Sequence, residues 1–365
     1  MISLFLSGDV MTGRGIDQIL RHPGDPVLHE SYIRDARRYV ELAEAAYGPI
    51  PRPVDDAYIW GDALEVLAGA AVDVRIVNLE TSITRGGSPW PGKEVHYRMH
   101  PANVGCLTAA RIDCCSLANN HVMDWGYVGL DETIDTLDTA GVARAGAGRE
   151  AAEAAAPAVL EVPGKGRVLV FAFGSPTSGV PRSWRAAANR PGLNLLDDLS
   201  EETALACARR IRGAMQPGDV SVASIHWGPN WGYTIPPEEI AFSRRLVENG
   251  VSIVHGHSSH HAKAIRIHQG RPILHGCGDF VNDYEGIGGY EEFRGDLSPM
   301  YLIEWDPSED RLAEVRIVAL RSRRLRLERA PVEDTRWLRD LLNRQGSPDL
   351  EARLAGDHGM TLHWR

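Results

Sequence analysis

Short runs of apolar and β-branched residues alternate along this chain with longer segments whose apolar residues recur at helical spacing. The clearest runs predict strands at Ile2–Leu6, Val72–Val77, Ile112–Leu117, Val168–Phe173, Val220–Ile225, Val251–Val254 and Pro272–Leu274. The segments between them predict helices at Ile33–Tyr47, Ala63–Ala70, Leu130–Ala140, Glu201–Met215 and Pro237–Asn249. Strands that alternate with helices of this length are typical of an α/β architecture.

The end of the chain has a different pattern. Leu312–Leu327 alternates as one long strand would, and Val332–Arg344 has the periodicity of an amphipathic helix. No internal repeat or low-complexity linker sets this part of the sequence apart. We therefore expect one domain over residues 1–310, with residues 311–365 as a C-terminal strand and helix packed on it.

Polar side chains gather where the predicted strands end. Six successive strand ends offer carboxylates, amides and imidazoles, and seven of the 14 histidines fall between His226 and His275. In open α/β sheets the loops at the carboxyl ends of strands meet at one crevice, where ligands bind. Oxygen and imidazole ligands together suit Zn, Mn or Fe.

Each of these residues has an ordinary structural explanation when it is taken alone. A strand-end Asp9 is typical of a turn or a helix N-cap, and His226 beside Trp227 is typical of a core histidine. The whole set is harder to explain in this way, because burying so many polar groups unpaired would cost several kcal/mol. The combination therefore favours a metal site.

The charge and the cysteines exclude some classes of protein. The chain has 39 Lys and Arg against 49 Asp and Glu, a net charge of −10, which argues against a nucleic-acid binder. Its five cysteines form no C-x-x-C pair, which favours a reducing compartment. The sequence also has no signal-peptide pattern and no apolar run of about 18 residues. We therefore expect a cytoplasmic protein without a membrane span.

Several short strings follow these strands in a fixed order. They are Gly8-Asp9-Val10-Met11-Thr12-Gly13-Arg14, Asn78-Leu79-Glu80-Thr81, Leu117-Ala118-Asn119-Asn120-His121, His226-Trp227-Gly228, Gly256-His257-Ser258-Ser259-His260 and Gly276-Cys277-Gly278-Asp279-Phe280. Over roughly residues 2–285 the set resembles the CapA-type family of poly-γ-glutamate capsule biosynthesis proteins, in the calcineurin-like metallophosphoesterase superfamily. The resemblance implies a four-layer αββα sandwich with metals at the strand ends.

The resemblance also implies a set of metal ligands. They are Asp9, Glu80, Asn120, His226, His257 and His260. Asp9 would bind the first ion, Glu80 would take the position of the bridging carboxylate, and the histidines after Gly256 would complete both sites. The cofactor would be one or two divalent ions of Mn, Fe or Zn.

Other residues would act on the substrate. His121 matches the catalytic histidine of the superfamily, which assists the leaving group or stabilises developing charge. Arg14 resembles the arginine after the first motif and would contact an anionic substrate. Trp227 and Tyr233 lie in an aromatic loop that is either a substrate-gripping lid or a packed surface loop. Asp279 and Asp283 are candidates for orienting the ligating imidazoles.

Three departures from the superfamily pattern matter. Met11 stands where the first motif has histidine, and Glu80 replaces an aspartate. The usual Gly-His-x-His has an extra residue and a further histidine, so His255 or His261 could also be a ligand. A site with one ion and a site with two ions both remain open.

Two functions fit these features. The first is a metal-dependent hydrolase that acts on a phosphoester or a γ-glutamyl amide bond. The second is a non-catalytic scaffold of the same fold that binds an anionic polymer or a partner protein in capsule biosynthesis. Met11 favours the scaffold, whereas Asn120, His121 and His226 favour catalysis. A run of arginines from Arg321 to Arg329 indicates either a phosphate patch or, by preference, a solvated face paired with acids.

Overall fold

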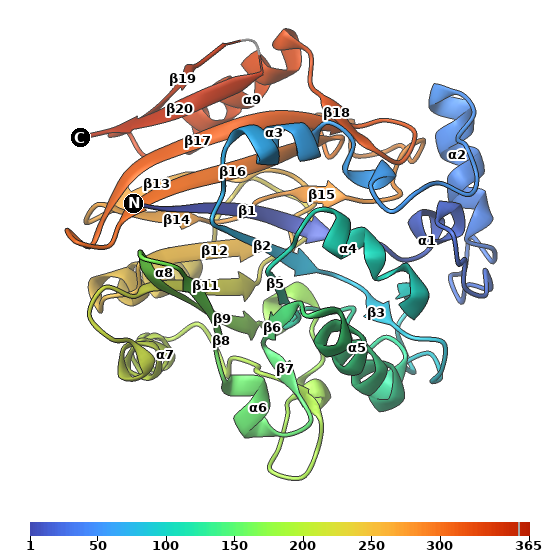
Figure 1. The fold of residues 1–365 in the computed structure, drawn as a ribbon, viewed down its shortest axis with the longest axis horizontal. Helices are drawn as coiled ribbons and strands as arrows, with labels where there is room; N and C mark the ends of the chain where they lie inside the picture. Colours follow the sequence, from blue (N-terminus) through green and yellow to red (C-terminus); the bar gives the residue numbers. More distant parts are fainter. Residues whose placement is uncertain (357) are drawn as a thin grey trace.

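Two β-sheets lie face to face, and helices cover the outer face of each (Figure 1). The computed structural model describes residues 1–356 and 358–365. Its layers confirm the four-layer α/β sandwich that the resemblance to the calcineurin-like superfamily implied.

The first sheet is centred on β1 (Ile2–Val10), which pairs in parallel with β2 (Val74–Leu79) and in antiparallel with β16 (Leu297–Asp306). Its order is β19-β20-β17-β16-β1-β2-β5-β6, with β15 paired to β1 and β18 paired to β17. The remaining strands are β5 (Cys114–Ser116), β6 (Ala143–Ala145), β15 (Asp279–Val281), β17 (Arg311–Ser322), β18 (Leu327–Arg329), β19 (Leu350–Leu354) and β20 (Gly359–Trp364).

The second sheet has the order β13-β14-β12-β11-β9-β8, with its four middle strands parallel. Its strands are β8 (Ala158–Val162), β9 (Gly166–Gly174), β11 (Val220–His226), β12 (Ile253–His257), β13 (Ile265–His268) and β14 (Arg271–Leu274). Two short pairs stand apart, formed by β3 (Ser82–Ile83) with β4 (Arg98–Met99) and by β7 (Ala147–Gly148) with β10 (Gly192–Leu193).

The helices divide between the two outer faces. On the first sheet, α3 (Ala63–Gly69), α4 (Gly105–Ala109) and α5 (Gly126–Ala140) share a core with β1 and β2. On the second sheet, α7 (Glu201–Ala214) and α8 (Pro237–Glu248) cover β9, β11 and β12. The other helical segments are α1 (Gly15–Ile19), α2 (Arg37–Tyr47), α6 (Ala151–Ala155), α9 (Val332–Gln345) and the 3₁₀ turns η1 (Tyr58–Trp60), η2 (Pro101–Asn103), η3 (Pro176–Ser178), η4 (Arg182–Trp184) and η5 (Glu291–Phe293).

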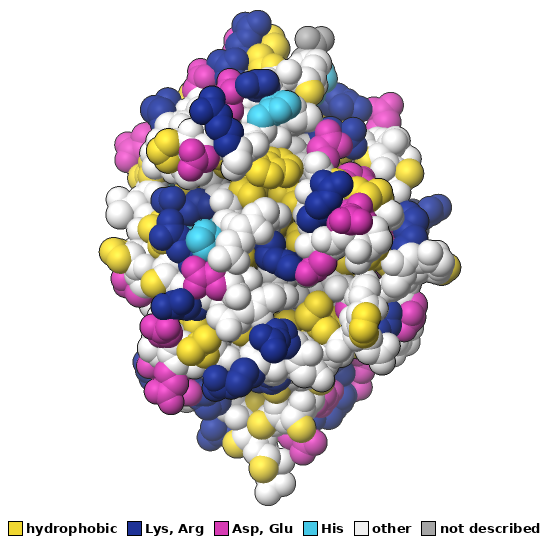
Figure 2. Space-filling model, turned by 90° about the vertical axis from the view of Figure 1, so that its left-hand side faces the viewer, with side chains coloured by type: hydrophobic (Ala, Val, Ile, Leu, Met, Phe, Trp, Pro, Cys, Tyr) yellow, Lys and Arg dark blue, Asp and Glu magenta, His cyan; other side chains and the backbone are white. Residues whose placement is uncertain are grey.

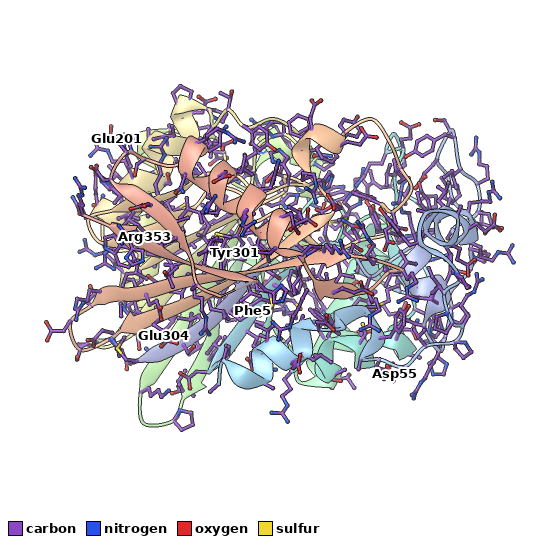
Figure 3. The ribbon with its side chains drawn as sticks, turned by 90° about the horizontal axis from the view of Figure 1, so that it is seen from above. Phe5, Asp55, Glu201, Tyr301, Glu304 and Arg353 are labelled. Carbon is purple, nitrogen blue, oxygen red and sulfur yellow. The ribbon has the colours of Figure 1, made fainter. Side chains whose placement is uncertain are left out.

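Side chains alternate along the central strands, so they pack in two different cores, one under the helices of the first sheet and one between the two sheets. Phe5 faces the helices on the first sheet, whereas Tyr301 of β16 belongs to the core between the sheets. Figure 3 shows both residues inside the body of the molecule, with Asp55 and Glu201 at its margins. This packing leaves the carboxyl ends of the parallel strands of both sheets at one edge of the sandwich.

Most predicted elements are present, and the differences have physical reasons. The long strand predicted over Leu312–Leu327 is broken by a turn after Ser322, where Arg324 and Leu325 have positive φ angles of 55° and 54°. β16 was not predicted, and Pro299 is a residue that the interior of a sheet usually excludes. Its pairing with β1 runs only from Trp305 to Tyr301, so β1 requires no hydrogen bond from the proline.

Residues 311–365 add strands to the first sheet, and α9 packs beside them. Among the residues that the structure describes, no helix combines the length and apolar character needed to cross a bilayer. Figure 2 shows the face on the left of Figure 1, where basic and acidic side chains are interspersed and neither sign gathers.

Candidate metal centre

Strand register brings the polar strand ends together. Asp9 at the end of β1 is in register with Asn78 of β2 on one side and with Asp279 of β15 on the other. In the second sheet, His226 of β11 is in register with His257 of β12. Only glycine fits before Asp9, because a Cβ atom on Gly8 would lie 1.8 Å from the carbonyl oxygen of Gly278.

Two groups of three side chains in the described part of the chain could each hold a metal ion. The imidazole-rich group consists of Asp9, His226 and His257, and the carboxylate-rich group consists of Asp9, His260 and Asp279. Within each group, one donor atom of every member lies within 4.8 Å of the others, and all members are buried. Asp9 belongs to both groups, so two ions bound there would share its carboxylate.

The imidazole-rich group presents neutral ring nitrogens. The Nδ1 atoms of His226 and His257 lie 2.9 Å apart, and Asn120 Oδ1 lies 3.0 Å from His226 Nε2. Burial holds the pKa of both histidines well below the ordinary value. A neutral imidazole keeps the electron pair that a metal ligand must supply.

The carboxylate-rich group is built around an acid–imidazole contact. His260 Nδ1 lies 2.9 Å from Asp279 Oδ1, and Asn282 donates to the other Asp279 oxygen at 2.9 Å. Burial, followed by the charge of Asp279, raises the pKa of Asp9 to about 7. Burial would lower the pKa of His260, but the nearby Asp279 raises it overall. A divalent cation would relieve the crowding of these carboxylates, so the donor set fits a metal.

Glu80 lies beside both groups without belonging to either. Its Oε1 is 3.8 Å from the Nε2 atoms of His121 and His226, and its Oε2 accepts a hydrogen bond from Asn78 at 3.3 Å. Burial, followed by the charge of Asp9, raises the pKa of Glu80 well above its ordinary value. Its bridging role stays a prediction.

His121 is held in place by Asp124, which in turn contacts Lys93. Its Nδ1 lies 2.6 Å from Asp124 Oδ2, and Lys93 Nζ donates to the other Asp124 oxygen at 2.5 Å. Burial lowers the pKa of His121 to about 4 despite the neighbouring Asp124. The His-x-x-Asp spacing was the available signal for Asp124. Lys93 comes from the segment before β4 and had no comparable signal.

Arg14 is already fully engaged by protein groups. It forms a two-pronged pair with Asp283, at 3.2 Å from Nε and 2.5 Å from Nη2, and its Nη1 donates to Glu30 at 2.8 Å. The guanidinium lies over the ring of Tyr39, 3.8 Å from its centroid. Arg14 is therefore buried between acids and an aromatic ring, and its contact with a substrate stays a prediction.

The aromatic loop after His226 divides between interior and cavity. Trp227 is buried, and its indole N–H donates to the carbonyl of His275 at 2.9 Å. Tyr233 packs against His261, with 4.7 Å between ring centroids, and its hydroxyl donates to the carbonyl of Glu292. Neither Trp227 nor Tyr233 lines the cavity beside the metal centre, whereas Trp231 of the same loop does.

The two alternative histidine ligands lie outside the donor groups. His255 Nε2 lies 2.8 Å from the carbonyl oxygen of Ser7, and His261 Nδ1 lies 3.1 Å from that of Ala262. His257 and His260 are the ones that the fold brings to Asp9.

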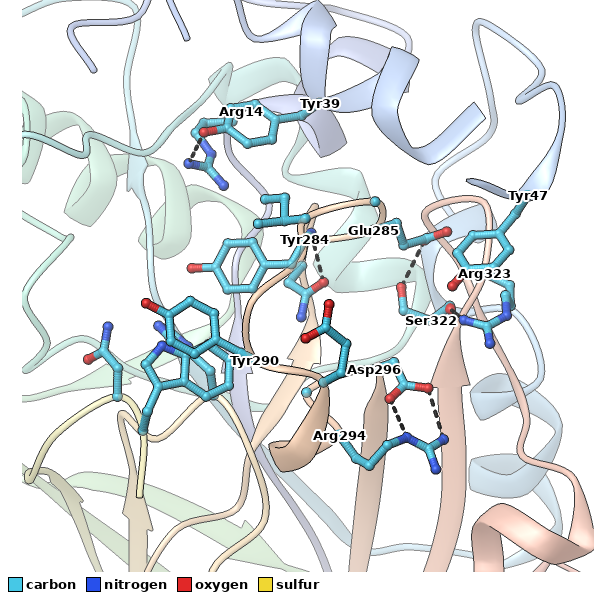
Figure 4. Close-up of a pocket in the computed structure, with 18 of the residues that line it drawn as sticks. Arg14, Tyr39, Tyr47, Tyr284, Glu285, Tyr290, Arg294, Asp296, Ser322 and Arg323 are labelled. Carbon is cyan, nitrogen blue, oxygen red and sulfur yellow. Dashed lines mark hydrogen bonds and ion pairs between the residues drawn. The ribbon is translucent and has the colours of Figure 1, made fainter. Parts of the chain in front are cut away.

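A cavity of about 770 Å³ opens beside His260 (Figure 4). Trp231 and Tyr290 stack on each other in its wall with 4.2 Å between ring centroids, and the Trp231 ring lies 5.4 Å from that of His260. A small molecule in this cavity would therefore lie next to the carboxylate-rich group.

The chain is similar to proteins named for capsule, PGA and polyglutamine synthesis. A probable polyglutamine synthesis accessory protein of Mycobacterium tuberculosis is 48% identical over 345 residues, which cover 94% of this chain and 91% of that protein. The PGA biosynthesis protein CapA of Bacillus subtilis is 23% identical over 284 residues, covering 78% of this chain and 64% of the relative. Among solved structures, a phosphatase from Mycoplasma pneumoniae has a TM-score of 0.47 and 12% identity, with coverage of 87% and 92%.

Residues 3–284 match the family described as bacterial capsule synthesis protein PGA_cap. The matched segment contains every residue of both donor groups, together with His121, Asp124 and Lys93. The resemblance to CapA-type proteins is thereby confirmed, and the chain belongs to the PGA_cap family of bacterial capsule synthesis proteins.

Proposed function

We propose that this protein is a metal-dependent hydrolase that cleaves a phosphoester or a γ-glutamyl amide bond. The observation that carries the proposal is the position of His121 Nε2, 3.8 Å from Glu80 at the edge of two donor groups that share Asp9. A non-catalytic scaffold would not require a buried histidine whose Nε2 faces Glu80 beside the donor groups.

The donor groups would hold the metal, and His121 would act on the substrate. Asp9, His226 and His257 would hold one ion, and His260 and Asp279 would hold a second ion with Asp9. A bound divalent ion supplies polarisation of the substrate oxygen and activation of water. Asp124 fixes the ring of His121 through Nδ1, and because the neutral ring has no proton on Nε2, that nitrogen would first take a proton from the attacking water and then pass it to the leaving group.

The relatives' names suggest the class of substrate. They refer to polyglutamine synthesis and to CapA, which favours an anionic γ-glutamyl or phosphate-bearing small molecule.

The cytoplasmic location expected from the cysteines, all five of which are free and buried, stays a prediction.

A non-catalytic scaffold is the second candidate. Two observations favour it, namely Met11 at the place of a superfamily ligand and the full pairing of Arg14 with protein acids. The word accessory in the mycobacterial relative's name also fits a binding role.

The variant His121→Ala separates the two candidates. Purified protein would be loaded with Mn or Zn, its metal content measured by ICP-MS, and its turnover followed on phosphoesters and γ-glutamyl amides. We expect turnover to fall by about 10²- to 10⁴-fold while the metal content stays unchanged. His268→Ala is the matched control, because His268 is partly exposed and pairs with Glu248 away from the donor groups. Equal turnover in both variants would remove His121 from the reaction, and absence of bound metal in the wild type would favour the scaffold.

A further inference from the structure

The arginine run near the end of the first sheet is paired with acids at every position but one. Arg321 pairs with Asp334, Arg324 with Glu328, Arg326 with Asp62 and Arg329 with Glu65, at distances of 3.3–3.7 Å. Within the described residues, Arg323 has no carboxylate oxygen within 4.0 Å. The acid-paired face that the sequence predicted thus accounts for four of the five arginines and leaves Arg323 to be explained.

Arg323 lines the same cavity as His260. Its guanidinium lies over the ring of Tyr47, 4.0 Å from the centroid, and its Nη1 donates to the carbonyl of Ser322 at 2.9 Å. A guanidinium has five N–H donors, so most of those on Arg323 are free of protein partners in the described part of the chain.

The other cations of the cavity are already paired with acids. Arg294 makes two contacts with Asp296, at 2.7 and 3.0 Å, and Arg14 is held by Asp283 and Glu30. Glu285 accepts hydrogen bonds from Ser322 and from two backbone N–H groups. Among the described cavity residues, Arg323 is therefore the cation with no carboxylate oxygen within 4.0 Å, and Glu285, whose pKa burial raises and the charge of Arg323 lowers in part, is held by hydrogen bonds of its own.

The backbone holds Arg323 in place. It opens a tight turn in which Arg323 and Arg326 exchange backbone hydrogen bonds, and Arg324 and Leu325 take positive φ angles that side chains disfavour. The Glu285 carboxylate binds the N–H groups of Arg324 and Leu325 at 2.7 and 2.6 Å. Glu285 therefore fixes the turn, and little ordering is required when Arg323 meets a ligand.

The cavity joins this cation to the metal centre. Figure 4 shows Arg323 and Tyr47 on one side of the cavity and Tyr290 on the other. Tyr290 stacks on Trp231, which contacts His260, so the metal centre lies on the side opposite Arg323. Exposed aromatic and aliphatic side chains line the space between and around them, namely Tyr32, Tyr47, Ile287 and Tyr290.

We propose that Arg323 binds a second anionic group of the substrate, a carboxylate or a phosphate, while the reacting group lies at the metal centre. The position of the reacting group rests on the proposed function. A planar guanidinium supported by an aromatic ring matches two oxygens of such an anion. The protein would then select substrates with negative groups at both ends of an apolar or uncharged stretch.

Binding of simple dicarboxylates tests this proposal without turnover. Calorimetry on the Mn-loaded full chain would compare straight-chain dicarboxylates of four to ten carbons with monocarboxylates of equal length. We expect at least one dicarboxylate to bind roughly tenfold more tightly than its monocarboxylate, the effect of a charged hydrogen bond. Arg323→Gln should abolish this preference, whereas Arg324→Gln, an exposed and acid-paired neighbour, should retain it. A parallel series with a terminal phosphate monoester distinguishes the two kinds of anion.

The outcomes separate the two proposals. An undiminished preference in Arg323→Gln, or no preference at any length in the wild type, overturns the role of Arg323. Arg323→Lys checks the folded state and geometry together, since it keeps the charge and should keep part of the preference. If the preference depends on Arg323 but no substrate is turned over, the hydrolase proposal fails while the anion site stands.

Discussion

The two donor groups share Asp9 but differ in the origin and chemistry of their other members. The imidazole-rich group takes both histidines from neighbouring strand ends of the second sheet, where register alone brings them together. The carboxylate-rich group takes His260 from the loop after β12 and Asp279 from β15, which pairs with β1 in the first sheet. Met11 stands where the first motif of the superfamily has histidine, and Asp279 is in register with Asp9 on the neighbouring strand β15. We therefore predict that Asp279 takes the place of the missing histidine ligand.

Asp9→Asn is expected to have the largest effect, because it removes the carboxylate that both groups share. Both ions should be lost, and turnover should fall by about 10³-fold or more. ICP-MS after dialysis, with a thermal melt to show that the variant is folded, measures this. Retention of about one equivalent of metal would mean that one group binds without Asp9.

His226→Ala breaks the imidazole-rich group alone. We expect the loss of about one equivalent of metal and a fall in turnover of about 10²-fold. His275→Gln is the control, since His275 is similarly buried but stacks on Trp227 and belongs to neither donor group. If both variants lose metal equally, the loss results from disturbing this buried region and not from removing a metal ligand.

Asp279→Asn breaks the carboxylate-rich group and keeps the size of the side chain. The expected result is again the loss of about one equivalent, here with a smaller change in turnover, about tenfold. Met11→His in the Asp279→Asn background sharpens the test, because it restores the histidine of the superfamily motif. Recovery of the ion would show that Asp279 replaces that histidine, and full metal content in Asp279→Asn itself would contradict the second group.

The sequence predicted the parts of the site that follow strands it could recognise. Asp9, His226 and His257 end strands with clear apolar runs, so their meeting at one edge could be expected. Asp279 was expected beside the site but not as a donor, because β15 has three residues and its pairing with β1 joins distant parts of the chain.

The contact of Lys93 with Asp124 and the lack of an acid partner for Arg323 could not be predicted, for the same reason. Lys93 reaches Asp124 across 31 residues, and Arg323 differs from its neighbours only in which acids other elements bring near. The local periodicity of apolar residues predicts strands and helices, but it does not predict contacts between segments that are distant in the sequence.

The smallest expected effect comes from Glu239→Gln, which tests whether a raised carboxyl pKa marks a metal site. Burial raises the pKa of Glu239 to about 7, as it does for Asp9, but Glu239 lies outside both donor groups. The folded pKa lies above the ordinary 4.5, so the stability that Glu239 contributes is present below pH 4.5 and is lost as the pH rises through 7. Between pH 5 and 8 the wild type should lose about 2 kcal/mol more unfolding free energy than the variant.

Urea denaturation of the metal-free and metal-loaded forms measures this difference, with Glu202→Gln, an exposed glutamate on α7, as the control. The Glu239 contribution should be the same in both forms, because no donor group includes it. The part of the pH dependence that Asp9→Asn removes from the metal-free protein should be absent once metal is bound, since a cation stabilises the ionised carboxylate. If the Asp9 contribution persisted after metal was bound, the raised pKa of Asp9 would reflect burial in the sandwich and not a cation site.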